Sequence, residues 1–226
     1  MQISALILTL FLVASPAPGA ESLEKVLAVM DAAAAEFRSM TGRIDKTSFT
    51  KVLNDISEES GTIAIKKTGA RGMRLLVRIT KPDPKAYAFE GRKVEIYYPK
   101  TNLIEEYDLG KHRQLLDQFL LLGFGTPSSE LQAGYSIQLG GEETVAGQRT
   151  ARLELVPKSE KTREYLAKAE IWVSLSDGRT VRQKFHERSG DYRQVTFADA
   201  KWNLDLPDSA LKLNPPKGVK RVQPQR

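Results

Sequence analysis

KHRQLLDQFLLLGFG, residues 111 to 125, is apolar over more of its surface than an ordinary amphipathic helix, which keeps its apolar side chains on one stripe. On a helical wheel its apolar residues form two adjoining stripes, and Leu121 lies outside both. The run is much shorter than the roughly 20 apolar residues that cross a bilayer, and the glycines Gly123 and Gly125 end it. It is therefore either a helix inside a core or a lid over an apolar surface. The two stripes contain Leu115, Leu116, Phe119, Leu120 and Leu122.

Residues 22 to 40 predict an amphipathic helix near the N-terminus. Its apolar residues, Leu27 and Met30 among them, recur at the spacing of one helical face. Ser22 is the expected N-cap, and Gly42 follows the end of the pattern.

Most of the remaining chain predicts short strands joined by hairpin turns, about ten or eleven in all. Residues 73 to 80 alternate most strictly between apolar and polar, and residues 61 to 67 show the same period. Residues 54 to 60 predict an acidic turn. The side chains expected on the apolar face of these two strands are Ile63, Ile65, Met73, Leu75 and Val77.

This order of elements predicts a mainly β (α+β) fold. Strands follow one another without β–α–β alternation, which favours a single antiparallel sheet over a parallel one. We expect the sheet to curl into a half-open barrel, with the N-terminal helix and a short central helix covering its concave apolar face.

The chain divides into three predicted parts. Residues 1–20 read as a secretory signal peptide, with an uncharged apolar run followed by small residues. Residues 21–213 form one domain, because no linker or change of composition interrupts them. Residues 214–226 are a basic tail. Since the chain has no cysteine, disulfides and thiol chemistry are excluded. We expect an exported, periplasmic protein that is soluble after cleavage.

The positive charge gathers at the C-terminus. The net charge is +6, and residues 212 to 226 contain five basic residues and no acidic one. A nucleic-acid-binding domain would spread its basic residues over a folded face. The tail is therefore either a solubilising terminus or a contact for anionic lipid or an acidic partner.

The sequence contains no recognisable catalytic or metal-binding pattern. His112 and His186 have no second histidine or cysteine nearby in the sequence with which to share a metal. No Gly-x-Ser-x-Gly elbow is present. We therefore expect neither an enzyme nor a cofactor, and no metal site.

An exported protein whose curled sheet has, at its open end, a helix that is apolar on more than one side is typical of carriers of apolar ligands. We expect a monomer that binds no nucleic acid. The residues expected to line the cavity and its lid are Leu27, Met30, Ile63, Ile65, Met73, Leu75, Val77, Leu115, Leu116, Phe119, Leu120, Leu122 and Phe124.

Five short motifs, in this order and spacing, resemble the outer-membrane lipoprotein carrier (LolA-like) family of the bacterial periplasm. They are G-x-I-x-I-K-K at 61–67, E-G…Y-Y-P at 90–99, L-x-L-V-P-K at 153–158, S-D-G at 176–178 followed by Phe185, and P-P-K-G-V at 215–219.

The resemblance implies a half-open barrel whose cavity takes up lipoprotein acyl chains, without a cofactor. It implies an inner-membrane lipoprotein exporter and an outer-membrane acceptor as partners. Lys67 stands where the family has a cavity-gating arginine, and lysine lacks the bidentate guanidinium fork. Glu90 replaces the usual aspartate of the hairpin turn. These departures suggest a divergent branch with a different lipid or cargo.

Two other classes of function stay open. The first is an envelope lipid- or lipoprotein-sensing module without carrier activity, which would act through a membrane-anchored partner. The second is an envelope hydrolase, whose activity would depend on His112 or His186.

Overall fold

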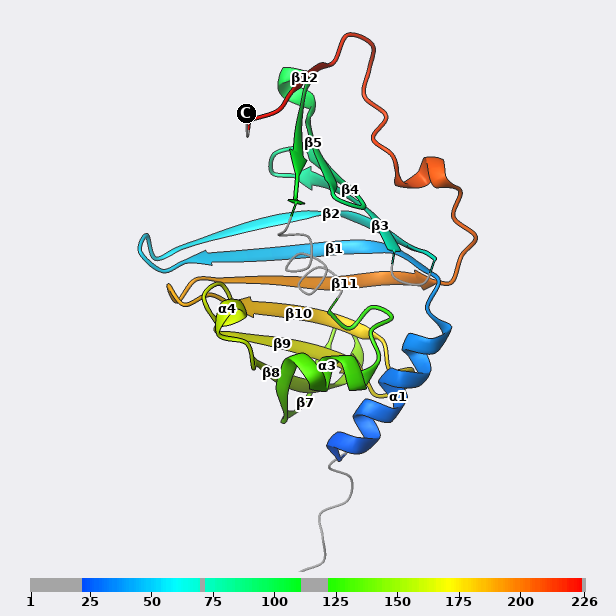
Figure 1. Ribbon diagram of the computed structural model, residues 1–226, viewed down its shortest axis with the longest axis vertical. Helices are drawn as coiled ribbons and strands as arrows, with labels where there is room; N and C mark the ends of the chain where they lie inside the picture. Colours follow the sequence, from blue (N-terminus) through cyan, green and yellow to red (C-terminus); the bar gives the residue numbers. More distant parts are fainter. Residues whose placement is uncertain (1–21, 70–71, 111–121, 225–226) are drawn as a thin grey trace, which may run out of the picture.

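The computed structural model describes residues 22–69, 72–110 and 122–224 (Figure 1). Its helices are α1 (Leu23–Glu36), α3 (Ser128–Gly134) and α4 (Glu160–Arg163), with short 3₁₀ turns η1 (Pro99–Thr101) and η3 (Asp208–Leu211). Its strands are β1 (Ser39–Thr50), β2 (Asp55–Thr68), β3 (Gly72–Lys81), β4 (Lys85–Glu90), β5 (Lys93–Tyr98), β6 (Leu103–Asp108), β7 (Tyr135–Val145), β8 (Gln148–Pro157), β9 (Lys168–Ser174), β10 (Thr180–His186), β11 (Tyr192–Trp202) and β12 (Lys220–Val222).

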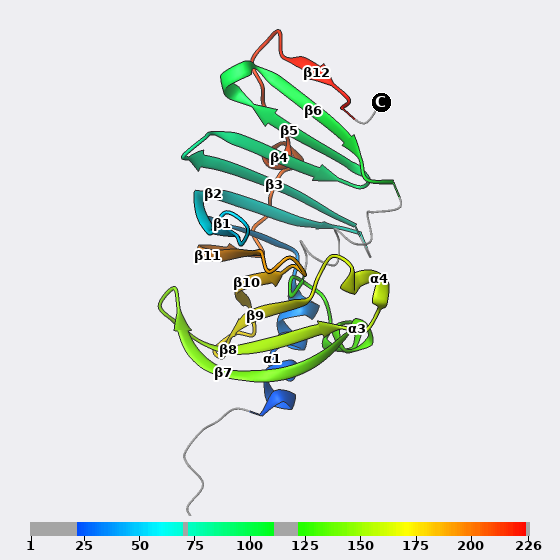
Figure 2. The same cartoon turned by 90° about the vertical axis from the view of Figure 1, so that its left-hand side faces the viewer.

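These strands form one twelve-stranded sheet in the order β12-β6-β5-β4-β3-β2-β1-β11-β10-β9-β8-β7. Every pairing is antiparallel except that of β12 with β6. The sheet curls but does not close, so β12 and β7 form its two edges (Figure 2). The predicted mainly β, curled antiparallel sheet is confirmed.

Helix α1 covers one face of the sheet at the β7–β9 end, and we call this the inner face. Val26, Leu27 and Met30 are buried there against residues of β8 and β9 such as Leu153 and Ile171. The predicted N-cap is confirmed, because the side chain of Ser22 accepts a hydrogen bond from the backbone N–H of Lys25.

The predicted helix end at Met40 is wrong. The helix stops at Glu36, and Phe37 already has extended backbone. Met40 lies in β1, fully buried, opposite Trp202 of β11 and Ile65 of β2. Two ladders of backbone hydrogen bonds therefore override a helical pattern that continues in the sequence.

The predicted acidic turn at residues 54–60 is also wrong, because β2 begins at Asp55. Thr50 pairs with Asp55, and the ladder with β1 continues along the whole of β2. The acidic side chains are tolerated because residues 55 to 58 are exposed.

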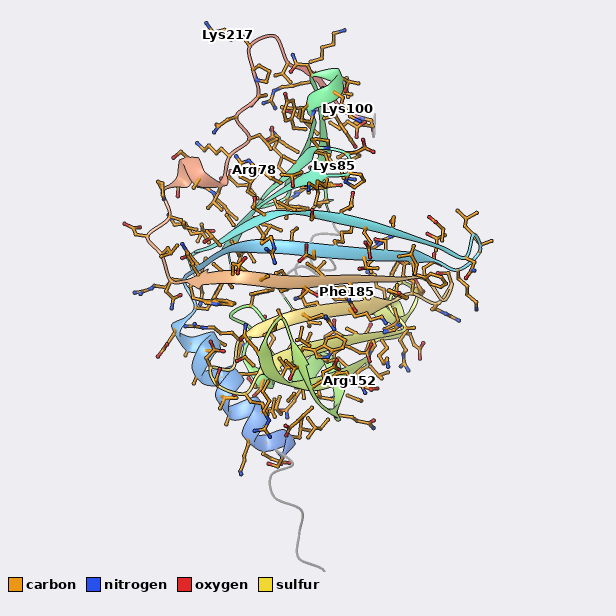
Figure 3. The ribbon with its side chains drawn as sticks, turned by 180° about the vertical axis from the view of Figure 1, so that it is seen from behind. Arg78, Lys85, Lys100, Arg152, Phe185 and Lys217 are labelled. Carbon is orange, nitrogen blue, oxygen red and sulfur yellow. The ribbon has the colours of Figure 1, made fainter. Side chains whose placement is uncertain are left out.

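Beyond β11 the chain forms a strap, residues 203 to 219, that crosses the outer face of the sheet (Figure 3). Leu211 is buried against Leu76 and Ala88, which point outward from β3 and β4. Beside it, Arg78 donates a hydrogen bond to the carbonyl of Lys212 at 3.3 Å. The strap leads to β12, which lies inside the predicted basic tail.

Strand β12 gives one of the basic residues of the tail a structural role. Arg221 forms ion pairs with Glu106 on the adjacent strand β6 and with Glu95 on β5, the strand beyond it, at 2.6 Å. These carboxylates hold the pKa of Arg221 above its usual value through their hydrogen bonds.

We expect Leu211→Ala to lower the free energy of unfolding by about 2 kcal/mol, because it leaves a cavity under the strap. Urea denaturation followed by circular dichroism measures this loss. Leu204→Ala is the matched control, because Leu204 is exposed on the same strap and should change stability by less than about 0.5 kcal/mol. Equal effects of the two variants would contradict packing of the strap on the sheet.

Candidate ligand-binding site

Aligned rows of apolar side chains cross the inner face of the sheet at β2, β3 and β4. Val77 lies opposite Ile63 on one side and Tyr87 on the other. In the next row, Leu75 lies opposite Ile65 and Phe89. Because side chains alternate between the faces of a strand, these residues all point to one side. The register therefore builds a continuous apolar surface from three separate strands.

Burial falls from the centre of the sheet toward β4 along this surface. Ile63, Ile65 and Leu75 are buried, whereas four neighbours stay only partly covered. The partly covered side chains, which we call the inner-face patch, are Met73, Val77, Tyr87 and Phe89. Large apolar side chains that remain partly exposed next to a core are typical of a binding surface.

Phe124 closes the central end of this surface. Its side chain is 1% exposed, and its ring lies 5.0 Å from that of Phe197 and 6.0 Å from that of Trp202. Gly125 has φ +68°, and a Cβ there would come within 2.8 Å of the ring of Phe37. Only glycine lets the chain turn this close to the aromatic cluster.

Side chains of β10 hold the segment before Phe124 in place. The hydroxyl of Thr180 donates to the carbonyl of Gly123 at 3.0 Å, and the amide of Gln183 donates to the carbonyl of Leu122. Both donors are buried, so these bonds are shielded from water. Leu122 and Gly123 are thereby fixed to β10.

The predicted site residues separate into two clusters. Ile63, Ile65, Met73, Leu75, Val77 and Phe124 come together on the inner face of β2 and β3. Leu27, Met30 and Leu122 belong instead to the core between α1 and β7–β9. Leu115, Leu116, Phe119 and Leu120 lie outside the described residues, as does His112.

A small cavity lies between α1 and the aromatic cluster. Its volume is about 10 Å³, and Phe37, Arg179 and Trp202 are among the residues that line it. This is room for about one water molecule, not for an acyl chain. The candidate ligand surface is therefore the inner-face patch.

Lys67 lies on the inner face, opposite Met73, and its backbone N–H donates to the carbonyl of Arg38 at 2.8 Å. Its neighbour Lys66 points to the outer face, where its ammonium group donates to the carbonyl of Leu206 at 2.6 Å. Of the two adjacent lysines, only Lys67 stands beside the inner-face patch.

Tyr87 and Phe89 were not among the predicted site residues, although the sequence carries a signal for them. In K-A-Y-A-F-E, residues 85 to 90, large and small residues alternate. The small residues Ala86 and Ala88 are buried on the outer face, which leaves the large ones on the inner face.

Three charged side chains border the inner-face patch, and they too were not among the predicted site residues. Glu59 forms ion pairs with Lys46 at 2.6 Å and with Lys85 at 2.5 Å. Burial raises the pKa of Glu59, but the hydrogen bonds and charges of the two lysines outweigh it and hold this pKa below its usual value. Burial lowers the pKa of Lys85, and its hydrogen bonds to Glu59 and Tyr87 reverse the direction, so the pKa is raised. Glu59 and Lys85 are therefore both charged at neutral pH.

His186 lies away from this site. It shares a 2.6 Å hydrogen bond with Glu170 on the outer face, where Lys168 also pairs with Glu170 at 3.3 Å. Burial raises the pKa of Glu170, but the hydrogen bond to His186 and the charge of Lys168 outweigh it, so the pKa is lowered. The cluster is an ion network that joins β9 to β10.

We expect Glu170 to make stability depend on pH. Because its pKa is lower in the folded protein than in the unfolded chain, its contribution is present above about pH 4.5 and is lost as the pH falls through the folded pKa. Urea denaturation between about pH 3 and pH 7 measures this loss. Glu170→Gln should show a shallower decline; an unchanged decline would contradict the role of Glu170.

Within the described residues, no helix is long and apolar enough to cross a membrane. In the same part of the chain, no group of three or more His, Cys, Asp or Glu residues is placed to hold a metal ion.

Solved structures share this fold at low sequence identity. MucB is 15% identical with a TM-score of 0.54 over 88% of this chain, and the chain spans 64% of the MucB length. An uncharacterised conserved protein from Thermus thermophilus is 15% identical with a TM-score of 0.54, over 90% of this chain and 99% of that one. The Mycobacterium tuberculosis lipoprotein LppX is 14% identical with a TM-score of 0.50, over 82% and 99%.

No protein-family model and no curated protein matches the sequence. The likeness to the solved structures therefore establishes the fold and not the activity. Together with the curled, open sheet and the patch on its inner face, it confirms the resemblance at the level of architecture: the chain has the LolA-like fold that it shares with MucB and LppX.

Proposed function

We propose that this protein is a periplasmic carrier that shelters the acyl chains of lipoproteins, or of a related lipid, and passes them between the inner and outer membranes. The main support for this proposal is the inner-face patch. Its side chains are large, apolar and partly exposed, and they continue into the buried cluster around Phe124. An acyl chain laid along this surface would cover them.

The energetics of such a site suit a carrier. Burying one methylene contributes about 0.8 kcal/mol, so sheltering about eight carbons contributes about 6 kcal/mol before the costs of binding. Such a complex holds its cargo in water and still releases it to an acceptor that shelters the chain more completely.

The remaining parts of the proposal rest on the sequence and its resemblance. Residues 1–20 direct export, residues 21–213 form the carrier domain, and Lys67 serves as the gate. The segment that contains Leu115, Leu116, Phe119 and Leu120 covers the site as a lid. An inner-membrane exporter donates the cargo, an outer-membrane acceptor receives it, and no catalysis or cofactor is involved.

Titration with a fluorescent fatty acid tests the proposal. We expect saturable binding with a rise in fluorescence, because the probe leaves water for an apolar surface. A purified protein that leaves the fluorescence unchanged at every concentration would overturn the carrier proposal.

The second candidate is an envelope module that senses a lipid or lipoprotein without transporting it. The inner-face patch would serve this candidate as well, because sensing a lipid also requires a surface that covers its acyl chain. Transfer distinguishes the two candidates. A carrier loaded with the fluorescent fatty acid should give it up to added vesicles at a rate that rises with the amount of protein, whereas a sensor should retain it.

A further inference from the structure

The ion cluster of Lys46, Glu59 and Lys85 lies on the same face of the sheet as the inner-face patch. Lys46 is directly opposite Glu59 in the pairing of β1 with β2. Lys85 begins β4 (labelled in Figure 3), opposite the buried Ile79, and stands two residues before Tyr87. Residues two apart on a strand point to the same face and are separated by about 7 Å. The cluster therefore borders the patch directly.

The cluster contains more positive than negative charge. Two ammonium groups share one carboxylate, which leaves a net charge of +1. Each ammonium has three N–H donors, and the ion pairs recorded among the described residues give neither lysine a second carboxylate. The outer-face cluster of β5 and β6 is balanced by comparison, because Arg221 and Lys93 there face Glu95 and Glu106.

The two lysines are partly shielded from water. Their side chains are 29% and 24% exposed, and that of Glu59 is 14% exposed. An anion that reaches them would be attracted more strongly than at an open surface, where water and salt screen the charges. The ammonium of Lys85 also lies 5.9 Å from the centre of the Tyr87 ring, so cation and apolar surface are continuous.

We propose that Lys46 and Lys85 bind the anionic head group, a carboxylate or a phosphate, of a lipid whose acyl chain lies on the inner-face patch. This inference rests on the proposed function and adds to it a class of ligand. A bare acyl chain needs only apolar surface, and a net positive cluster at the border of that surface selects a chain that carries a negative charge. Glu59 holds the two ammonium groups together when the site is empty.

A purely structural ion cluster would behave differently from a head-group site when its members are changed one at a time. If the cluster only joins β1, β2 and β4, losing any member should weaken the protein without favouring one ligand over another. If it binds an anion, Lys46→Gln and Lys85→Gln should weaken anion binding, whereas Glu59→Gln should strengthen it by raising the net charge from +1 to +2.

The test compares a dansyl-labelled undecanoic acid with its methyl ester, which has the same chain and no charge. The wild-type protein should bind the acid about five- to tenfold more tightly than the ester, and about 0.5 M salt should reduce this preference. A matched lysophosphatidic acid and its uncharged monoacylglycerol test the phosphate head group in the same way. Lys93→Gln, which removes a charge from the outer face, is the control and should leave the preference unchanged.

A preference that Lys46→Gln or Lys85→Gln abolishes, and that Glu59→Gln enlarges, would support the head-group site. Equal binding of charged and uncharged probes by the wild-type protein would overturn it while leaving the carrier proposal intact, and this comparison needs no variant to fold. Failure of all four probes to bind would overturn both. A preference for one charged probe over the other identifies the head group as carboxylate or phosphate and supports the site in either case.

Discussion

Val77→Glu is expected to abolish binding of an uncharged acyl probe, such as the dansyl methyl ester. Val77 lies in the middle of the inner-face patch, between Ile63 and Tyr87, so its replacement would place a carboxylate against the bound chain. A carboxylate at this position stays hydrated or pairs with the nearby Lys85, and either way the middle of the patch loses the apolar contact that the chain needs. We expect affinity to fall by at least about 100-fold, equivalent to about 2.7 kcal/mol, in a fluorescence titration.

Thr62→Glu is the matched control for this variant. Thr62 is exposed on the outer face, on the strand next to Val77, and it pairs with Arg78. It adds the same charge without touching the patch, so probe binding should be unchanged. Circular dichroism would show whether both variants fold. A folded Val77→Glu protein that binds the ester as well as the wild type does would contradict a site on this surface.

Phe124→Ala is expected to cause the largest loss of stability, about 3–5 kcal/mol. The ring is almost fully buried and packs edge-on against Phe197 and face-to-face against Trp202, with Phe37 on a third side. Truncation would leave a cavity among these aromatic rings. The midpoint of thermal unfolding should fall by about 10 °C for a domain of this size.

Phe49→Ala provides the comparison. Phe49 stacks on Tyr192 at 5.3 Å but is only partly buried, near the end of β1. Its loss should cost about 1 kcal/mol. If Phe124→Ala lowered the free energy of unfolding no more than Phe49→Ala does, the packing of Phe124 among the aromatic rings would be contradicted.

The features that could be predicted from the sequence are those set by a regular local alternation of apolar and polar residues. Residues 73 to 80 carry an apolar side chain at every second position, which predicted a strand, and Met73, Leu75 and Val77 share one face as predicted. The exception to the alternation, Leu76, is buried on the other face under the strap. The antiparallel sheet was also predicted from a local pattern, namely short strands that follow one another through hairpin turns. The patch itself was found only in part, because Tyr87 and Phe89 contribute to it from a neighbouring strand.

Features set by pairing between distant strands could not be predicted. The helical pattern of residues 22 to 40 gives no sign that Met40 pairs with Trp202, 162 positions later. Likewise, the ion pair of Lys46 with Glu59 depends on the register of a hairpin whose turn was placed in the wrong residues. Lys85 joins that pair from β4, where it lies opposite Ile79 of β3. Side chains that meet in this way carry no short-range signal in the sequence.

Mass spectrometry of the lipids bound to the protein would show whether its inner face carries an acyl chain in the cell. The protein would be purified from the native periplasm without detergent and examined intact and after organic extraction. We expect a bound lipoprotein or acyl lipid in the wild-type protein and its loss in Val77→Glu, whereas Thr62→Glu should retain it. A wild-type protein that carries no acyl-containing molecule, or a Val77→Glu protein that carries the same amount, would contradict it.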